Sequence, residues 1–376
     1  MDSLSGERQP LPPDPISLYV CGITPYDTTH LGHAFTFVQF DVLVRALRWL
    51  GHQLTYVQNV TDIDDSILQR ARRDGVNWRT LGEDQTRRYE RDMQALNVAP
   101  PDHFVAATAV IPTMIGLIER LIALEAAYQV RGNSVFFRAA SAPTFGELSK
   151  LSRAEMLEIA GQQDDADLDD PRKEDRLDFA LWKGSSGRAD EPAWESPWGS
   201  GRPGWHIECS AICLRYLGKQ VGIHGGGRDL IFPHHECEIV QSERANGVRP
   251  FARLWSHVAM VRKDGAKMSK SLGNMVFVHE LLERYSSDAI RLCLLGHHYR
   301  EVWEWAPAEL DAAAGLAERL SSAAAEPDHG GEACARVQAA LADDLDTPRA
   351  VEALEEASGA PLRELGAVLG LRLSDR

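Results

Sequence analysis

The chain has 376 residues, a mass of 41.6 kDa and a formal net charge of −15, with 44% hydrophobic and 25% charged side chains. This composition is typical of a globular protein of about two or three domains, and it excludes a chain that is disordered throughout. The acidic balance disfavours a protein that wraps nucleic acid by bulk charge, although a local basic patch stays compatible with it. We expect no membrane span, because no apolar run reaches about 18 residues. The polar segment 1–14 has no apolar stretch for a secretion signal, so we expect a cytoplasmic protein.

The N-terminal part alternates between short apolar segments and helical spacing. Residues 16–21 and 54–60 predict strands, and residues 33–50 between them predict a helix. A strand–helix–strand unit of this kind indicates a parallel α/β sheet with right-handed crossovers. Farther along, apolar residues at helical spacing predict an amphipathic helix over residues 110–124.

The middle of the chain changes character twice. The acidic segment 162–178 contains a proline and predicts an exposed loop. The segment 182–204 is rich in Trp, Pro and Gly, and we expect it to be irregular but packed. Residues 220–223 and 251–260 predict two further strands.

The C-terminal region differs from the rest in composition. After about residue 306, Ala, Glu, Leu and Arg dominate, as they do in helices. Residues 311–376 carry thirteen acidic and six basic side chains. We therefore expect a small helical bundle without a basic surface.

The tetrapeptide from His30 to His33 follows a predicted strand and begins a predicted helix. A helix N-terminus presents unpaired N–H groups and positive potential, and Gly32 allows a ligand to approach the backbone. Two imidazoles can donate hydrogen bonds to phosphate oxygens. The alternative is a pair of surface histidines at a helix cap.

A second motif, Lys267-Met-Ser-Lys270, has two lysines among small residues and suits a mobile loop that clamps a polyphosphate. Alone, such a loop is usually a solvated turn. In this order, the two motifs resemble the HIGH and KMSKS signatures of class I aminoacyl-tRNA synthetases, whose Rossmann-type catalytic domain binds ATP. The chain does not match two other nucleotide-binding signatures. It has no Walker A motif, and segment 224–229 lacks the third glycine of a dinucleotide fingerprint.

Two thiols, an imidazole and a carboxylate make a plausible zinc set: Cys21, Cys209, His234 and Glu238. The His and the Glu are four residues apart and fall on one helix face. The six cysteines of the chain are an even number, but we expect reduced thiols in a cytoplasmic protein. Spacing alone leaves core thiols as an alternative, and it leaves rival ligands, namely Cys213, His235 and Cys237.

Segments 19–27, 59–65, 196–209 and 224–238 resemble the cysteinyl-tRNA synthetase family, and the similarity covers residues 16–350. The resemblance implies that the four zinc ligands are those proposed above and that the charge on the triphosphate is stabilised by His30, His33, Lys267 and Lys270. It further implies that Trp205 walls the side-chain pocket and that Asp229 contacts the ribose. The remaining substrate-binding residues that it implies are Cys21, Gly22, Ile23, Thr24, Thr36, Asn59, Val60, Thr61, Gly227, Arg228 and Val261.

The expected chemistry suits the expected metal. Cysteine and serine are nearly the same size, and an apolar pocket separates them poorly. A zinc ion lowers the pKa of a thiol and binds the thiolate, whereas a hydroxyl stays protonated and binds weakly. Zinc with room for one more ligand would therefore select cysteine.

The resemblance also implies the architecture. We expect an α/β fold with a class I synthetase, Rossmann-type (HUP) parallel sheet. The catalytic domain would span residues 1–306, with an α/β insertion at about residues 90–175. A small helical bundle would follow over residues 307–376.

Two branches of this family share the activation step. One charges tRNA, and the other, the mycothiol ligase, joins cysteine to the amine of glucosaminyl-inositol. Segments 24–27, 234–237 and 297–305 look like the ligase branch. The chain ends soon after segment 343–348, so we expect it to lack the anticodon-binding domain, and its acidic end would repel a phosphate backbone.

Three features depart from the ligase branch. Glu238 matches the fourth zinc ligand of the synthetases, and Leu272 is also similar to the synthetases. Segment 168–171 stands where the ligases carry a glycine pair. The acceptor is therefore glucosaminyl-inositol or another amine.

Together these features predict an ATP-dependent, AMP-forming cysteine ligase that forms cysteinyl-AMP, releases pyrophosphate and transfers cysteine to a small-molecule amine in mycothiol biosynthesis or a related pathway. We expect Mg²⁺ on ATP, one zinc ion per chain, neither tRNA nor membrane as partner, and a monomer or homodimer. Two alternatives stay open: a truncated cysteinyl-tRNA synthetase that charges tRNA, and a non-catalytic zinc-binding paralogue. The sequence names no general base for the transfer step.

Overall fold

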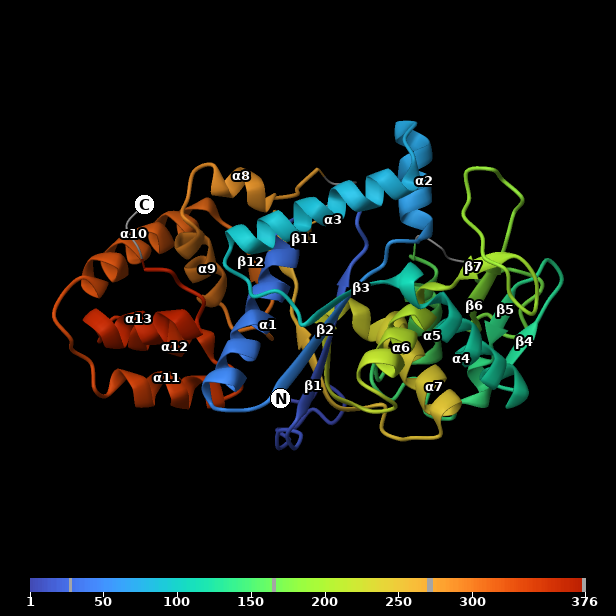
Figure 1. Cartoon of the computed structure of the whole chain (residues 1–376), viewed down its shortest axis with the longest axis horizontal. Helices are drawn as coiled ribbons and strands as arrows, with labels where there is room; N and C mark the ends of the chain where they lie inside the picture. Colours follow the sequence, from blue (N-terminus) through green and yellow to red (C-terminus); the bar gives the residue numbers. More distant parts are fainter. Residues whose placement is uncertain (27–28, 164–166, 269–272, 374–376) are drawn as a thin grey trace.

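A parallel sheet forms the centre of the computed structural model, which describes residues 1–376 except 27–28, 164–166, 269–272 and 374–376 (Figure 1). Its strand order is β3–β2–β1–β8–β9, and every neighbouring pair is parallel. The strands are β1 (Ile16–Ile23), β2 (Leu54–Val60), β3 (His103–Ala106), β8 (Val221–Gly227) and β9 (Ala252–Val258). The predicted parallel sheet is confirmed, and its four predicted strands all form, β2 at its predicted bounds and the other three with ends shifted by up to four residues.

Helices cover both faces of this sheet. The predicted helices over 33–50 and 110–124 are confirmed as α1 (Leu31–Trp49) and α4 (Ile111–Ala123). The others near the sheet are α2 (Asp65–Asp74), α3 (Trp78–Ala95), α5 (Arg153–Ala160), α6 (Trp205–Tyr216) and α7 (Glu236–Asn246). Among the described residues, no helix combines the length and apolarity needed to cross a bilayer.

A second, antiparallel sheet lies at the far end of the molecule in Figure 1. It consists of β4 (Ala127–Gln129), β5 (Val135–Phe137), β6 (Phe179–Gly184) and β7 (Gly201–Pro203). The expectation of an irregular segment over 182–204 was wrong at both ends, because Trp182 and Pro203 pair across β6 and β7. The described residues of segment 162–178 contain neither helix nor strand, as predicted.

A small sheet and a helical region complete the chain. The small sheet has β10 (Val261–Lys263) between β11 (Ala266–Lys267) and β12 (Trp303–Glu304), with α8 (Val278–Leu282) and α9 (Ser287–Leu295) in the intervening chain. The predicted C-terminal helices are α10 (Pro307–Ala324), α11 (Ala333–Ala342), α12 (Thr347–Leu354) and α13 (Gly359–Val368). The assigned domain limits stay predictions.

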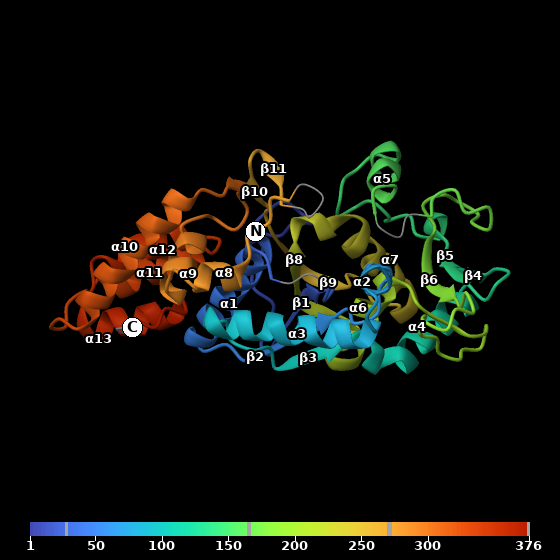
Figure 2. The same ribbon diagram turned by 90° about the horizontal axis from the view of Figure 1, so that it is seen from above.

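Two apolar cores share the central sheet. One joins α1, α9 and the helices α10–α13 to one face, and the other joins α4, α6, α7 and the antiparallel sheet to the opposite face (Figure 2). Successive side chains of a strand point to opposite faces. Leu18 and Val20 therefore enter the first core, and Tyr19 and Cys21 enter the second.

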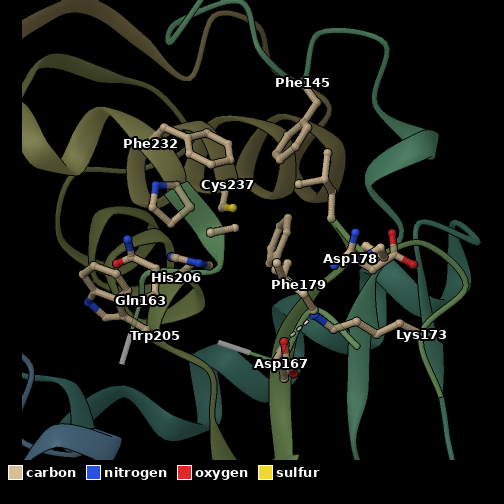
Figure 3. A pocket seen from close by; sticks show the side chains of 16 residues that line it. Phe145, Gln163, Asp167, Lys173, Asp178, Phe179, Trp205, His206, Phe232 and Cys237 are labelled. Carbon is tan, nitrogen blue, oxygen red and sulfur yellow. Dashed lines mark hydrogen bonds and ion pairs between the residues drawn. The ribbon is translucent and has the colours of Figure 1, made fainter. Parts of the chain in front are cut away.

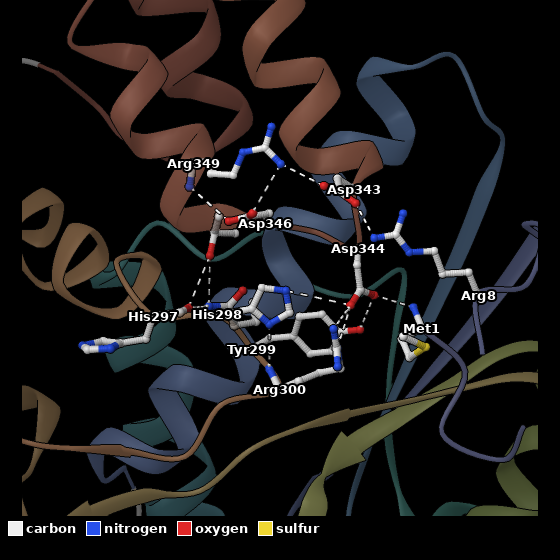
Figure 4. Close-up of polar contacts among 12 residues, drawn as sticks. Met1, Arg8, His297, His298, Tyr299, Arg300, Asp343, Asp344, Asp346 and Arg349 are labelled. Atoms are coloured by element: carbon white, nitrogen blue, oxygen red, sulfur yellow. Dashed lines mark hydrogen bonds and ion pairs between the residues drawn. The ribbon is translucent and has the colours of Figure 1, made fainter. Parts of the chain in front are cut away.

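The turn between α11 and α12 is fastened to the chain that leads into β12 (Figure 4). The Asp344 carboxylate accepts hydrogen bonds from Tyr299 Oη at 2.8 Å and from Arg300 Nε at 2.6 Å, and it contacts the Met1 ammonium. The carbonyl of Tyr299 accepts from Ala259 N at 2.7 Å. The C-terminal helices are thus connected to the end of β9.

Candidate functional site

A cavity of about 730 Å³ opens at the carboxyl ends of the parallel strands, where ligands bind in open α/β sheets. Most of the residues predicted for substrates and catalysis line it: Cys21, Gly22, Ile23, Thr24, His30, His33, Thr36, Asn59, Thr61, Trp205, Gly227, Asp229, Val261 and Lys267. Val60 and Arg228 lie beside it rather than in its wall. Lys270, like Leu272, falls outside the described residues. The roles assigned to all these residues stay predictions.

Gly22 allows the ends of β1 and β2 to approach closely. A Cβ atom at this position would lie 1.8 Å from the carbonyl oxygen of Asn59, so no other residue fits this backbone. The Gly22 N–H donates to Asn59 Oδ1 at 2.7 Å, and Asn59 Nδ2 donates to Thr61 Oγ1 at 3.1 Å. The floor of the cavity is therefore held at fixed spacing.

His30 lines the cavity and also has a structural role at the start of α1. Its Nδ1 accepts hydrogen bonds from the backbone N–H groups of Gly32 and His33, at 3.1 and 3.4 Å, and so caps α1. The alternative of two surface histidines at a helix cap is confirmed in part, because His30 caps the helix but both rings line the cavity. Because Nδ1 is an acceptor, the proton of the neutral ring lies on Nε2, which makes Nε2 a donor. The rings of His30 and His33 stack with centroids 3.7 Å apart.

Lys267 extends from the β10–β11 hairpin over the cavity. Its Nζ lies 2.9 Å from Asp229 Oδ2, and both side chains are about half exposed. This ion pair connects the lysine segment to the residue predicted to contact a ribose.

The four predicted metal ligands meet at the floor of the cavity and are named the thiol cluster: Cys21, Cys209, His234 and Glu238. The two sulfur atoms are 3.8 Å apart, and Cys21 Sγ lies 3.6 Å from Glu238 Oε1. His234 Nε2 lies 3.3 Å from Cys209 Sγ and 3.2 Å from Glu238 Oε1. All four side chains are buried.

These spacings fit a tetrahedral ion. Bonds of about 2.0–2.3 Å at tetrahedral angles put neighbouring ligand atoms about 3.3–3.8 Å apart. A second possible group shares two members and adds His224 and His235. Of the rivals that spacing left open, His235 alone joins either group among the described residues. The thiol cluster has two sulfur ligands rather than one, which suits zinc better.

Burial dominates the electrostatics of the thiol cluster. It raises the pKa of Cys21 well above its ordinary value, and the neighbouring Cys209 adds to this rise. Burial likewise raises the pKa of Cys209 and Glu238 and lowers that of His234. Burial thus favours the neutral forms of these groups, whereas a bound divalent cation favours thiolate and carboxylate forms.

His206 is a residue that the sequence analysis missed. Its Nδ1 lies 3.0 Å from Nδ1 of His234, whose other nitrogen faces the thiol cluster. The Trp205 ring stacks on the His234 ring with centroids 4.3 Å apart. The two contacts fix the ring that would bind a metal, as outer partners of ligating histidines do. The sequence feature that could have pointed to His206 is its position directly after Trp205, which the family resemblance places at the side-chain pocket.

The sequence analysis gave no role to the other lining residues, some of which lie within the segments that it named. They are Tyr26, Phe37, Asp64, Ser66, Gln162, Gln163, Leu230, Met260, Met268 and Met275.

A family model described as the catalytic domain of class I (C) tRNA synthetases matches residues 7–315. Among curated relatives, a protein of Frankia casuarinae is 49% identical over 374 residues, which cover 97% of this chain and 79% of the relative. A protein of Mycolicibacterium smegmatis is 46% identical over 361 residues, covering 94% and 87%. Both are named L-cysteine:1D-myo-inositol 2-amino-2-deoxy-alpha-D-glucopyranoside ligase.

Solved structures support the fold. Methionyl-tRNA synthetase of Mycobacterium tuberculosis, in complex with methionyl-adenylate, aligns with a TM-score of 0.64 at 16% identity and covers 95% of this chain and 88% of that one. A leucyl-tRNA synthetase of Agrobacterium radiobacter aligns with a TM-score of 0.62 at 12% identity, covering 95% and 82%. At these identities the likeness concerns the Rossmann-type architecture alone.

Proposed function

The chain belongs to the class I (C) tRNA synthetase family, and on that premise we propose that it is an ATP-dependent, AMP-forming cysteine ligase. The observation that carries the proposal is the thiol cluster at the floor of a cavity whose rim holds His30, His33 and Lys267. The floor would select an amino acid by its thiol, and the rim would bind the phosphates of ATP.

Cys21, Cys209, His234 and Glu238 would hold one zinc ion, which supplies affinity for a thiolate when it is bound. Trp205 stacks on His234 and would close the side-chain pocket around the cysteine. Mg²⁺ would accompany ATP on its phosphates.

In the first step, a carboxylate oxygen of cysteine attacks the α-phosphorus of ATP, the bond to the bridging oxygen breaks, and pyrophosphate leaves. Catalysis of this step is mostly positioning and charge stabilisation. The capped N-terminus of α1, the Nε2–H of His30, His33 and Lys267 would stabilise the developing charge, together with Lys270.

In the second step, the acceptor amine attacks the carbonyl carbon of cysteinyl-AMP, an amide forms, and AMP leaves while the amine loses a proton. The names of the relatives make glucosaminyl-inositol, the acceptor of mycothiol biosynthesis, the best-supported choice. We further propose a cytoplasmic enzyme whose substrates are small molecules, without tRNA and as a monomer or a homodimer.

Charging of tRNA is the second candidate, and Glu238 is the residue that favours it. Its carboxylate joins the thiol cluster as a synthetase ligand would. Labelled cysteine that becomes attached to tRNA, but not to glucosaminyl-inositol, would decide for this candidate.

Cysteine-dependent exchange of labelled pyrophosphate into ATP tests the first step. We expect exchange with cysteine and at least about 100-fold less with serine, because a hydroxyl binds zinc weakly. A folded, zinc-loaded protein that catalyses no exchange with cysteine would refute the proposal and would favour a non-catalytic zinc-binding protein. Mass spectrometry after addition of glucosaminyl-inositol then identifies the product.

A further inference from the structure

A second cavity of about 530 Å³ lies between the first turn of α2 and the antiparallel sheet. Its wall includes residues of α2, β5, β6, β7 and the loop before β6: Asp65, Gln69, Phe136, Asp167, Asp170, Arg172, Trp182, Lys183 and Arg202. None of the roles proposed above uses this space, which we name the polar cavity, although Asp65, Asp170 and Arg202 lie in segments that the sequence analysis singled out.

The polar cavity and the central one both adjoin a small hollow of about 60 Å³, which is drawn in Figure 3. Gln163 and Trp205 line both the central cavity and the hollow, whereas Asp167 and Ala180 line both the hollow and the polar cavity. Gln163 and Trp205 therefore mark the side of the central cavity that lies toward the polar cavity.

The two cavities differ in their charged side chains. Three carboxylates and three cations line the polar cavity, namely Asp65, Asp167 and Asp170 with Arg172, Lys183 and Arg202. The charged side chains that line the central cavity are two carboxylates, Asp64 and Asp229, and one cation, Lys267, beside the imidazoles of His30, His33 and His234. Balanced charge suits a neutral ligand with many hydroxyl groups, since carboxylates accept and cations donate hydrogen bonds. The same carboxylates would repel a phosphate backbone.

The polar groups are held in place before any ligand binds. Lys183 Nζ lies 2.5 Å from Asp65 Oδ2, and Arg202 contacts the same carboxylate while its Nε donates to Glu191 at 3.1 Å. Arg172 pairs with Asp170 at 2.6 Å. Such preorganisation reduces the entropy lost on binding.

We propose that the polyol part of the acceptor binds in the polar cavity, while its amine extends past Gln163 and Trp205 to the carbonyl of the adenylate. This inference rests on the proposed function and adds to it the site of the second substrate.

The test separates the two half-reactions in the full-length, zinc-loaded enzyme. In the variants Arg172→Met and Asp170→Asn, we expect the KM for glucosaminyl-inositol to rise at least about tenfold, the effect of losing a hydrogen bond to a charged group. Cysteine-dependent pyrophosphate exchange, which needs no acceptor, should change by less than about twofold. Arg153→Met is the matched control, because Arg153 pairs with Asp175 and lies outside the cavity wall.

A second comparison uses glucosamine, an amine without the inositol ring. The unmodified enzyme should prefer glucosaminyl-inositol, and Arg172→Met should reduce that preference. Gln69→Ala, on the exposed side of α2, gives a milder change if the other variants misfold. An acceptor KM that stays within about twofold in all three variants, with exchange intact, would overturn the inference. Absence of exchange in the unmodified enzyme is a different result, which would overturn the proposed function and the inference together.

Discussion

The Asp41–Arg291 pair and the thiol cluster are both shielded from water, but their charges are balanced in different ways. Arg291 Nη2 lies 2.6 Å from Asp41 Oδ2, and both side chains are 0% exposed. The remaining donors of Arg291 reach the carbonyl oxygens of Leu96 and Leu369, and Asp41 also accepts from Arg45 and from Ala99 N. Groups of the protein itself therefore balance the charges of this pair and complete its hydrogen bonds.

The thiol cluster contains no arginine or lysine, and the partners of its Glu238 carboxylate are imidazoles, His234 at 3.2 Å and His224 at 3.1 Å. Two thiols and a carboxylate lie together, with imidazoles whose own charging is suppressed because burial lowers the pKa of His234 and His235. Buried acidic groups of this kind are stable when a bound cation compensates their charge or when they stay protonated. The comparison teaches that a buried polar cluster completed by its own members supports the fold, whereas an incomplete one indicates a ligand.

Cys209→Ser breaks the incomplete cluster and should have the largest effect. Loss of one ligand should lower zinc affinity by more than about 100-fold, and pyrophosphate exchange should fall with it. Zinc content measured by atomic emission and the exchange assay check both expectations. Cys213→Ser is the control, because Cys213 is buried one turn later on α6 and belongs to neither possible metal group. Normal zinc affinity in Cys209→Ser would contradict the assignment.

Arg291→Met breaks the complete pair. Removing one partner of a buried ion pair should cost about 3–5 kcal/mol of unfolding free energy, because Asp41 loses a charged neighbour. Urea denaturation measures this loss, and the zinc content of the folded variant should not change. The double variant Asp41→Leu/Arg291→Met should recover part of the stability, since apolar replacements remove both charges. If Arg291→Met is as stable as the unmodified chain, the Asp41–Arg291 pair does not support the fold as the comparison assumes.

Asp344→Asn should have the smallest effect, because Asp344 is satisfied but lies nearer to solvent. Loss of charge-assisted hydrogen bonds should cost about 1–3 kcal/mol. Asp343→Asn is the matched control, since Asp343 is exposed and its ion pairs with Arg8 and Arg349 lie at the surface, so no measurable change is expected.

The stability difference between Asp344→Asn and the unmodified chain should also depend on pH. Partial burial alone would raise the pKa of Asp344, but the Met1 ammonium, the Tyr299 hydroxyl and Arg300 hold it below its ordinary value. A carboxylate with a lowered folded-state pKa stabilises the fold fully above the unfolded value of about 3.9, and this contribution is lost as the pH falls through the folded-state value. Melting temperatures from neutral to acidic pH should therefore converge for the two chains. A constant difference would contradict this account.

The sequence predicts the long elements of this chain better than the short ones. Strand β2 was predicted to the residue because seven consecutive positions show the pattern. Strands β4, β5 and β7 have three residues each, too few for any period, and they form because partners elsewhere in the chain pair with them.

Sites made of residues close together in the sequence were also easier to predict than sites assembled from distant residues. Motifs near a strand end, such as His30 to His33, could be found because local spacing carries their chemistry. The ligand set of the thiol cluster needed the family resemblance, since Cys21 and Cys209 are 188 residues apart and spacing left rivals. The polar cavity and the Asp41–Arg291 contact have no local signature at all, because only the folded chain assembles them.

The alternation of side chains along β1 has a thermodynamic consequence. Leu18 and Val20 belong to the core beneath the C-terminal helices, and their neighbours Tyr19 and Cys21 belong to the other core. Because a single strand completes both, neither half can melt and leave the other intact, and calorimetry should record one cooperative transition. A metal ion bound through Cys21 would then raise the melting temperature of helices α10–α13 by mass action, although it touches none of them.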